Sequence, residues 1–138
     1  KGKYTFMILS LLYPEIKINE IEFHQDHMHP VYSFSEKNLL NIGFSKEDMN
    51  DLLHMKDQLA NLQLLKGREN ESKNKMPLED WIEKGNDKDK FLPEGVSLKL
   101  IDFKNFYEQR KKLMKVQLRI VFDMENSSFK EPSHEVLQ

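Results

Sequence analysis

The chain of 138 residues contains no cysteine, so it can form neither a disulfide nor a thiolate metal site. Any metal must therefore be held by histidine, aspartate, glutamate or asparagine side chains. The sequence also lacks a long hydrophobic run, because its longest, at residues 4–13, is too short to span a bilayer. No small-residue cleavage site follows this run, which disfavours a signal peptide. We expect a cytoplasmic protein without membrane contact.

The composition favours amphipathic helices over a thick central sheet, because hydrophobic residues make up 38% and charged residues 32%. The length suits one domain with a modest core. The net charge of -2 argues against a strongly basic DNA-coating protein. Residues 107–119 nevertheless hold five basic side chains, which could form a DNA-binding face or the wet face of a helix: Arg110, Lys111, Lys112, Lys115 and Arg119. Arg110 falls on the apolar stripe instead, so we expect it to make a structural hydrogen bond or salt bridge.

The hydrophobic pattern predicts a mainly helical fold with one small β-hairpin. Ser35 and Ser45 are suitable helix N-caps. The expected helices cover residues 4–12, 35–41, 45–58, 68–75, 78–84 and 101–122, and the expected strands or extended arms cover residues 17–23 and 61–65. Residues 126–138 lose the pattern and are expected to form a tail.

The residues best suited to chemistry begin in segment 23–30, Phe-His-Gln-Asp-His-Met-His-Pro. Cleavage of a phosphodiester needs an activated water and charge stabilisation at phosphorus. Histidine suits the first task because its ordinary pKa is about 6.5. Mg²⁺ prefers oxygen ligands and keeps several waters, so one carboxylate and one amide oxygen suffice. Asp26 can supply the carboxylate immediately before His27, and Asn70 can supply the amide, with Asn74 and Glu69 as rival ligands.

The order of these residues resembles that of an HNH (ββα-metal) nuclease. Asp-His-x-x-Pro lies at residues 26–30, an asparagine opens the apolar strand at residues 61–65, and Asn-x-x-Lys follows at residues 70–73. The last two spacings are those found in HNH domains of CRISPR effector nucleases. The resemblance implies a ββα-metal module at about residues 18–76, embedded in a helical nuclease domain of residues 1–125.

The resemblance also implies a function for each matching residue. Asp26 and Asn70 would bind a divalent metal, most simply Mg²⁺, with Mn²⁺ or Ni²⁺ as alternatives in vitro. His27 would be the general base. Asn61 would hold the His27 loop in place by hydrogen bonds across the hairpin. The implied activity is metal-dependent hydrolysis of DNA, which we expect to be double-stranded.

A closer likeness is to the C-terminal nuclease domain of GmrSD-type, modification-dependent restriction enzymes and their anti-phage relatives. It extends to residues 11–14, 75–81 and 106–114, and so covers most of residues 5–122. The gap between the first two motif elements is longer here than in the minimal motif. In that family a ParB-like nucleotide-binding domain usually precedes the nuclease. We therefore expect this chain to be the C-terminal effector of a restriction or phage-defence protein.

Several polar residues near the motif have more than one interpretation. Five are candidates for contact with substrate or phosphate: Lys66, Arg68, Lys73, Lys75 and His29. The alternative for the lysines and arginine is a solvated helix face. His24 is a candidate extra metal ligand, and imidazole ligands would favour later transition metals.

Two other functions remain open from the sequence. One is a zinc-type metal hydrolase whose ligands all come from segment 23–30: His24, Asp26, His27 and His29. That interpretation leaves Asn61 and Asn70 without a function. The other is a non-catalytic nucleic-acid-binding module in which the nuclease site has decayed.

Overall fold

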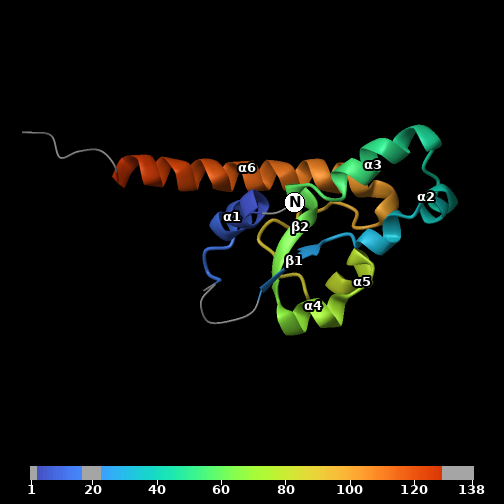
Figure 1. The fold of residues 1–138 in the computed structure, drawn as a ribbon, viewed down its shortest axis with the longest axis horizontal. Coiled ribbons are helices and arrows are strands. Elements are labelled where there is room, and N and C mark those ends of the chain that lie inside the picture. Colours follow the sequence, from blue (N-terminus) through green and yellow to red (C-terminus); the bar gives the residue numbers. More distant parts are fainter. Residues whose placement is uncertain (1–2, 17–22, 129–138) are drawn as a thin grey trace, which may run out of the picture.

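The computed structural model describes residues 3–16 and 23–128, which are mainly helical with one antiparallel β-hairpin (Figure 1). The elements are α1 (Lys3–Leu12), β1 (Phe23–His27), α2 (Glu36–Ile42), α3 (Met49–Met55), β2 (Leu62–Lys66), α4 (Gly67–Lys73), α5 (Leu78–Glu83) and α6 (Phe103–Ser128). Short 3₁₀ segments lie at Val31–Phe34, Lys46–Asp48, Leu59–Asn61 and Leu100–Asp102. The prediction of a mainly helical fold with a small hairpin is therefore confirmed.

The first strand of the hairpin extends further along the chain than predicted. β1 covers Phe23–His27, whereas the predicted arm at residues 17–22 lies outside the described residues. In the register of the hairpin, Asp26 is opposite Gln63 and His27 is opposite Leu62. The two motif residues thus lie within the strand and not after it. Because neighbouring side chains of a strand point to opposite faces, this placement separates Asp26 from His27.

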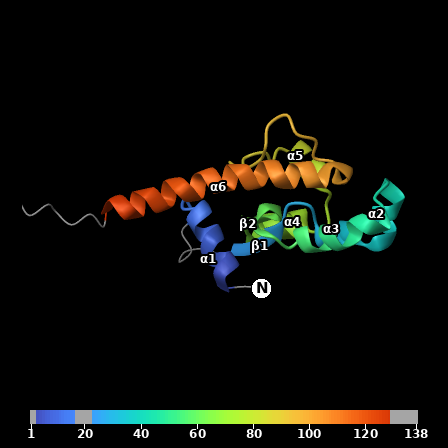
Figure 2. The same ribbon diagram turned by 90° about the horizontal axis from the view of Figure 1, so that it is seen from above.

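α6 forms the long edge of the structure, and the hairpin lies between it and α4 in Figure 1. The side chains of Phe103 and Phe106 on α6 are fully buried, as are those of Leu9 and Leu12 on α1. Full burial of such a side chain stabilises the fold by about 1.5–3 kcal/mol. The C-terminal part of α6 extends past the other described elements, as Figure 2 also shows. α6 runs to Ser128, so the first three residues of the predicted tail are helical.

Local sequence signals explain several of the helix boundaries. Ser35 Oγ accepts a hydrogen bond from Asn38 N at 3.3 Å and caps α2. Gly43 ends α2 at φ 117°, a left-handed conformation that glycine adopts without a steric penalty. Ser45 and Asp48 form the two halves of a capping box ahead of α3. None of the helices in residues 3–16 and 23–128 is long and apolar enough to cross a membrane.

Arg110 is a fully buried structural residue, as its place on the apolar stripe predicts. Its guanidinium donates hydrogen bonds to Ala60 O (3.0 Å) and Leu62 O (2.7 Å). It also donates to Tyr13 Oη at 2.9 Å and pairs with Asp89 Oδ2 at 3.2 Å. These contacts connect α6 with the start of β2, the end of α1 and the loop before Phe91. Arg110 thereby fixes the hairpin against the long helix.

Candidate functional site

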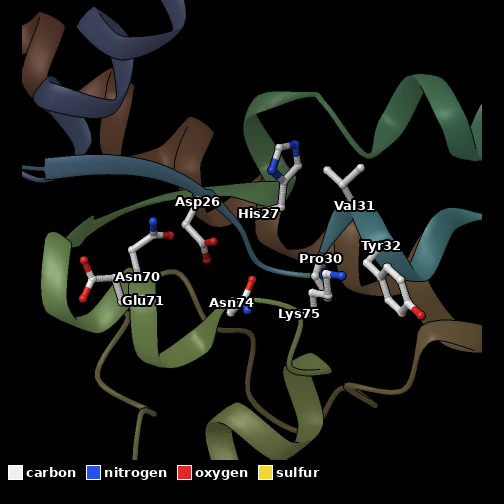
Figure 3. Close-up of a pocket in the computed structure, with 9 residues that line it drawn as sticks. All are labelled: Asp26, His27, Pro30, Val31, Tyr32, Asn70, Glu71, Asn74 and Lys75. Atoms are coloured by element: carbon white, nitrogen blue, oxygen red, sulfur yellow. The ribbon is translucent and has the colours of Figure 1, made fainter.

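A pocket of about 570 Å³ lies beside the hairpin, and three of the predicted site residues line it: Asp26, His27 and Asn70 (Figure 3). Asp26 and His27 come from β1, and Asn70 comes from α4. α4 begins directly after β2 ends, with no intervening loop. This abrupt strand-to-helix junction turns α4 back against both strands. It therefore brings together side chains that are more than 40 residues apart in the sequence.

The Asp26 carboxylate is held on one of its oxygens and open on the other. Oδ2 accepts a hydrogen bond from Gln63 Nε2 at 3.1 Å and pairs with Lys73 Nζ at 3.1 Å. Within the described part of the chain, Oδ1 has no hydrogen-bond partner. Figure 3 shows the carboxylate directed toward α4 and Asn70. The held oxygen orients the group, and the other oxygen is left for a ligand.

Lys73 pairs with Asp26 and does not line the pocket. The prediction that it contacts phosphate is wrong, because its side chain is fully buried. Its Nζ donates to His27 O at 2.6 Å as well as pairing with Asp26. Burial lowers the pKa of Lys73, and the Asp26 carboxylate opposes this shift. The Lys73 ammonium offsets the negative charge on Oδ2 of Asp26.

Two other predicted phosphate-binding residues, Lys66 and Arg68, are exposed but lie away from the pocket lining. Arg68 lines a separate hollow with Trp81. The basic side chain that lines the pocket is Lys75, from the segment after α4. A lysine contact to a ligand in this pocket would therefore be made by Lys75.

The His27 ring is oriented by an aspartate that lies 30 residues further along the chain. His27 Nε2 lies 3.0 Å from Asp57 Oδ1, and Asp57 Oδ2 in turn accepts from Lys56 Nζ at 2.6 Å. Figure 3 shows the ring directed away from α4, on the side opposite the Asp26 carboxylate. When Nε2 carries the proton and donates to Asp57, Nδ1 keeps its lone pair. The arrangement therefore suits a proton acceptor at Nδ1.

Asn61 is fully buried and clamps the backbone on both sides of the hairpin end. Its Oδ1 accepts from His29 N at 2.9 Å. Its Nδ2 donates to His29 O at 3.1 Å and to Lys56 O at 2.8 Å. Asn61 thus holds the turn that follows His27 and the segment that carries Asp57. Its side chain supports the site through these backbone hydrogen bonds and does not line the pocket.

His29 is a core residue. The prediction that it contacts substrate is wrong, because only 2% of it is exposed. Its ring packs edge-on against Phe103 (centroids 5.3 Å apart) and Phe106 (4.8 Å). Burial lowers the pKa of His29 to about 3, with the charge of Lys73 as a second cause. His29 lies two residues past the end of β1, where Asn61 holds its backbone, and its ring enters the hydrophobic core.

We expect the buried His29 ring to make the protein sensitive to mild acid. The imidazole binds a proton near its ordinary pKa of 6.5 in the unfolded chain but only near pH 3 in the folded protein. Between these values the unfolded state binds more protons, so the free energy of unfolding falls as the pH falls. The expected loss is about 1.4 kcal/mol per pH unit, or about 2 kcal/mol at pH 5.

Urea denaturation between pH 7 and pH 5 measures this effect. His29→Leu should flatten the pH dependence, because the variant has no buried imidazole to charge. His54→Leu is the matched control, since His54 is exposed on α3. Equal acid sensitivity in the wild type and in His29→Leu would contradict the expectation.

The remaining ligand candidates divide according to whether they line the pocket. Asn74 and Glu71 line it with Asn70, whereas Glu69 and His24 do not. Glu69 Oε2 accepts from the backbone N of Lys66 at 3.3 Å, at the start of α4. Asn74 has φ 40° and ψ −116°, a strained conformation of the kind that collects at functional sites.

The donor set of the pocket fits a hard divalent cation. The open Asp26 Oδ1 and the Asn70 side-chain amide, which has no hydrogen bond within the described residues, are both oxygen-bearing groups. Mg²⁺ takes such ligands and completes its shell with water. The described residues contain no group of three or more His, Asp or Glu side chains that could hold a metal. The zinc-cluster interpretation gains no support, because the His29 ring lies in the core.

Three residues of the site region were missed by sequence reasoning: Gln63, Asp57 and Tyr32. Gln63 carries a visible signal, since it is the one polar residue among the leucines at 62–65 of β2, and it lies directly opposite Asp26. Asp57 has no local signal, because its contact with His27 depends entirely on how the chain folds back. Tyr32 lies two residues after Pro30 and lines the pocket, which the motif alone does not indicate.

No protein-family model matches the chain, and a search of curated proteins found none that is significantly similar.

Proposed function

We propose that this chain is a metal-dependent DNA endonuclease domain of the HNH type, which hydrolyses phosphodiester bonds. The observation that carries the proposal is the meeting of Asp26, His27 and Asn70 at one pocket. They come from two elements that are far apart in the sequence, and they supply an open carboxylate oxygen, an oriented imidazole and a free amide. A base and two oxygen ligands are the groups that phosphodiester hydrolysis requires.

His27 accepts a proton from water at Nδ1, and the resulting hydroxide attacks phosphorus. Asp57 accepts the hydrogen bond from Nε2, which holds the ring in the tautomer that leaves Nδ1 free. The P–O3′ bond then breaks, and the departing oxygen takes a proton from solvent. Asp26 and Asn70 would hold the cation, which supplies charge stabilisation at the phosphate and at the leaving oxygen when bound.

The opposite orientations of Asp26 and His27 support an in-line displacement. In such a reaction the attacking and leaving oxygens lie on opposite sides of phosphorus. The Asp26 carboxylate points toward α4, and the His27 ring points to the other side of β1 (Figure 3). A phosphate at the end of the strand would therefore meet the base on one side and the metal ligands on the other.

We also infer the type of protein to which this domain belongs. The likeness to GmrSD-type enzymes supports a place in a restriction or phage-defence protein. A ParB-like nucleotide-binding domain would then be the partner of this domain, and DNA would be the substrate.

Removal of the Asn70 amide should weaken metal binding. We expect Asn70→Ala to bind Mg²⁺ or Mn²⁺ at least about tenfold more weakly, because it removes one of two protein ligands. Calorimetric titration measures the affinity, and nicking of plasmid DNA with an EDTA control measures the activity. Asn41→Ala is the matched control, since Asn41 is exposed on α2.

The outcomes separate the competing assignments. Weaker binding in Asn74→Ala but not in Asn70→Ala would move the ligand assignment to Asn74. Metal binding without any nicking would favour the non-catalytic binding module. Wild-type protein that neither binds a divalent metal nor nicks DNA would refute the nuclease.

A further inference from the structure

Tyr32 presents an aromatic ring to solvent at the edge of the candidate pocket. The residue is 69% exposed, yet it lines the same pocket as Asp26 and Asn70. Figure 3 shows Tyr32 and Lys75 on one side of the pocket, with Asp26 and Asn70 on the other. An exposed ring adds little to folding by burial. Its position beside the predicted ligands therefore needs another explanation.

The backbone around Tyr32 is held by packing and by a hydrogen bond, so the Tyr32 side chain projects from a fixed position. Pro30 and Phe34, on either side of it, are both buried. Phe34 packs edge-on against Phe103, with ring centroids 5.0 Å apart. Ser33 N donates to Pro30 O at 2.9 Å and closes the turn. A platform fixed before binding loses little conformational entropy when a ligand stacks on it.

Lys75 places a positive charge against this ring. Its Nζ lies 4.6 Å from the Tyr32 ring centroid, within the range of a cation–π interaction. Lys75 is exposed and is the basic side chain that lines the pocket. An aromatic face next to an ammonium is the combination that binds single-stranded nucleic acid, because the ring takes a base and the cation takes a phosphate.

We propose that Tyr32 stacks on an unpaired base next to the scissile phosphate while Lys75 contacts that nucleotide's phosphate. The substrate is therefore a DNA strand that is single-stranded or locally opened at the cut. A base within a duplex has both faces covered by its neighbours, so it can offer a face to Tyr32 only after leaving the stack. This inference rests on the proposed nuclease function and specifies its substrate.

Binding measured without cleavage tests the inference. We would measure fluorescence anisotropy of a labelled single-stranded DNA and of its duplex in EDTA, so that the readout needs neither metal nor turnover. Wild-type protein should prefer the single strand. Tyr32→Ser should bind the single strand about 5- to 150-fold more weakly, which is the value of one stacked base. Tyr32→Phe keeps the ring and should retain the affinity.

Two further variants identify the cause. Tyr4→Ser is the matched control, because Tyr4 is 77% exposed on α1 and does not line the pocket; it should bind as the wild type does. Lys75→Met should reduce the salt dependence of binding by about one phosphate contact.

The results distinguish this inference from the nuclease proposal. Equal single-strand affinity in Tyr32→Ser and wild type, a preference for the duplex, or no DNA binding at all would each overturn it. If plasmid nicking persists in any of these cases, the nuclease stands and only the stacking fails. Stacking on Tyr32 without nicking under any metal would instead count against the nuclease alone.

Discussion

Replacement of His27 by alanine should lower the rate of DNA cleavage by about 10²- to 10⁴-fold, the usual contribution of a general base. The ring is the only imidazole that lines the pocket within the described residues, and Asp57 fixes its Nε2. Alanine removes the group that takes the proton from water but leaves the Asp26 carboxylate in place. The measurement is the single-turnover rate of plasmid nicking with Mg²⁺ or Mn²⁺.

The control for His27 must separate lost chemistry from lost structure. His54→Ala removes an exposed imidazole from α3 and should cleave at the wild-type rate. Thermal unfolding and metal titration of His27→Ala should both stay close to wild type, since the ring is partly exposed and is not a predicted ligand. A rate within tenfold of wild type would show that another group is the base.

Replacement of Arg110 by methionine should lower the free energy of unfolding by about 3–5 kcal/mol. The variant keeps much of the side-chain volume but removes every guanidinium hydrogen bond. The carbonyl groups of Ala60 and Leu62 would lose their donor, and Asp89 would lose its cation in a site where only 7% of its side chain is exposed. Buried groups without partners cost much more than the original pairing gained. Urea denaturation measures the change.

Lys112→Met is the matched control for this prediction. Lys112 is exposed on the same helix, two residues after Arg110, so its loss should change the stability by no more than about 0.5 kcal/mol. Arg110→Lys should fall near the methionine variant, because an ammonium cannot reproduce the planar fork of the guanidinium. A loss below about 1 kcal/mol in Arg110→Met would mean that the buried network relaxes around the change.

The helices and caps were predictable because they depend on neighbouring residues. Ser35 and the Ser45–Asp48 pair cap the helices that their spacing indicates. The end of α6 was less predictable: the hydrophobic pattern fades after residue 122, but the helix continues to Ser128. Backbone hydrogen bonds within a helix persist beyond the last residue that packs against the core.

The first strand was harder to place than the second. The run at residues 61–65 corresponds closely to β2, whereas β1 extends to His27, beyond the predicted end at residue 23. Strand limits depend on which segment the partner strand can pair with, and this pairing spans more than 30 residues of sequence. An alternating pattern alone does not contain that information.

The residue pattern identified the mainly helical class and the hairpin, and the resemblance to HNH nucleases singled out the polar residues that meet at the pocket. The burial of individual polar side chains could not be predicted in this way. Lysine is mostly found at surfaces and histidine is intermediate in burial, yet Lys73 and His29 are both almost fully buried here. Asp57 and Tyr32 entered the site through folding, since each reaches it from a segment outside the motif. The physical reason is that residue type sets what a side chain can do, whereas its exposure and partners are set by distant segments that pack around it.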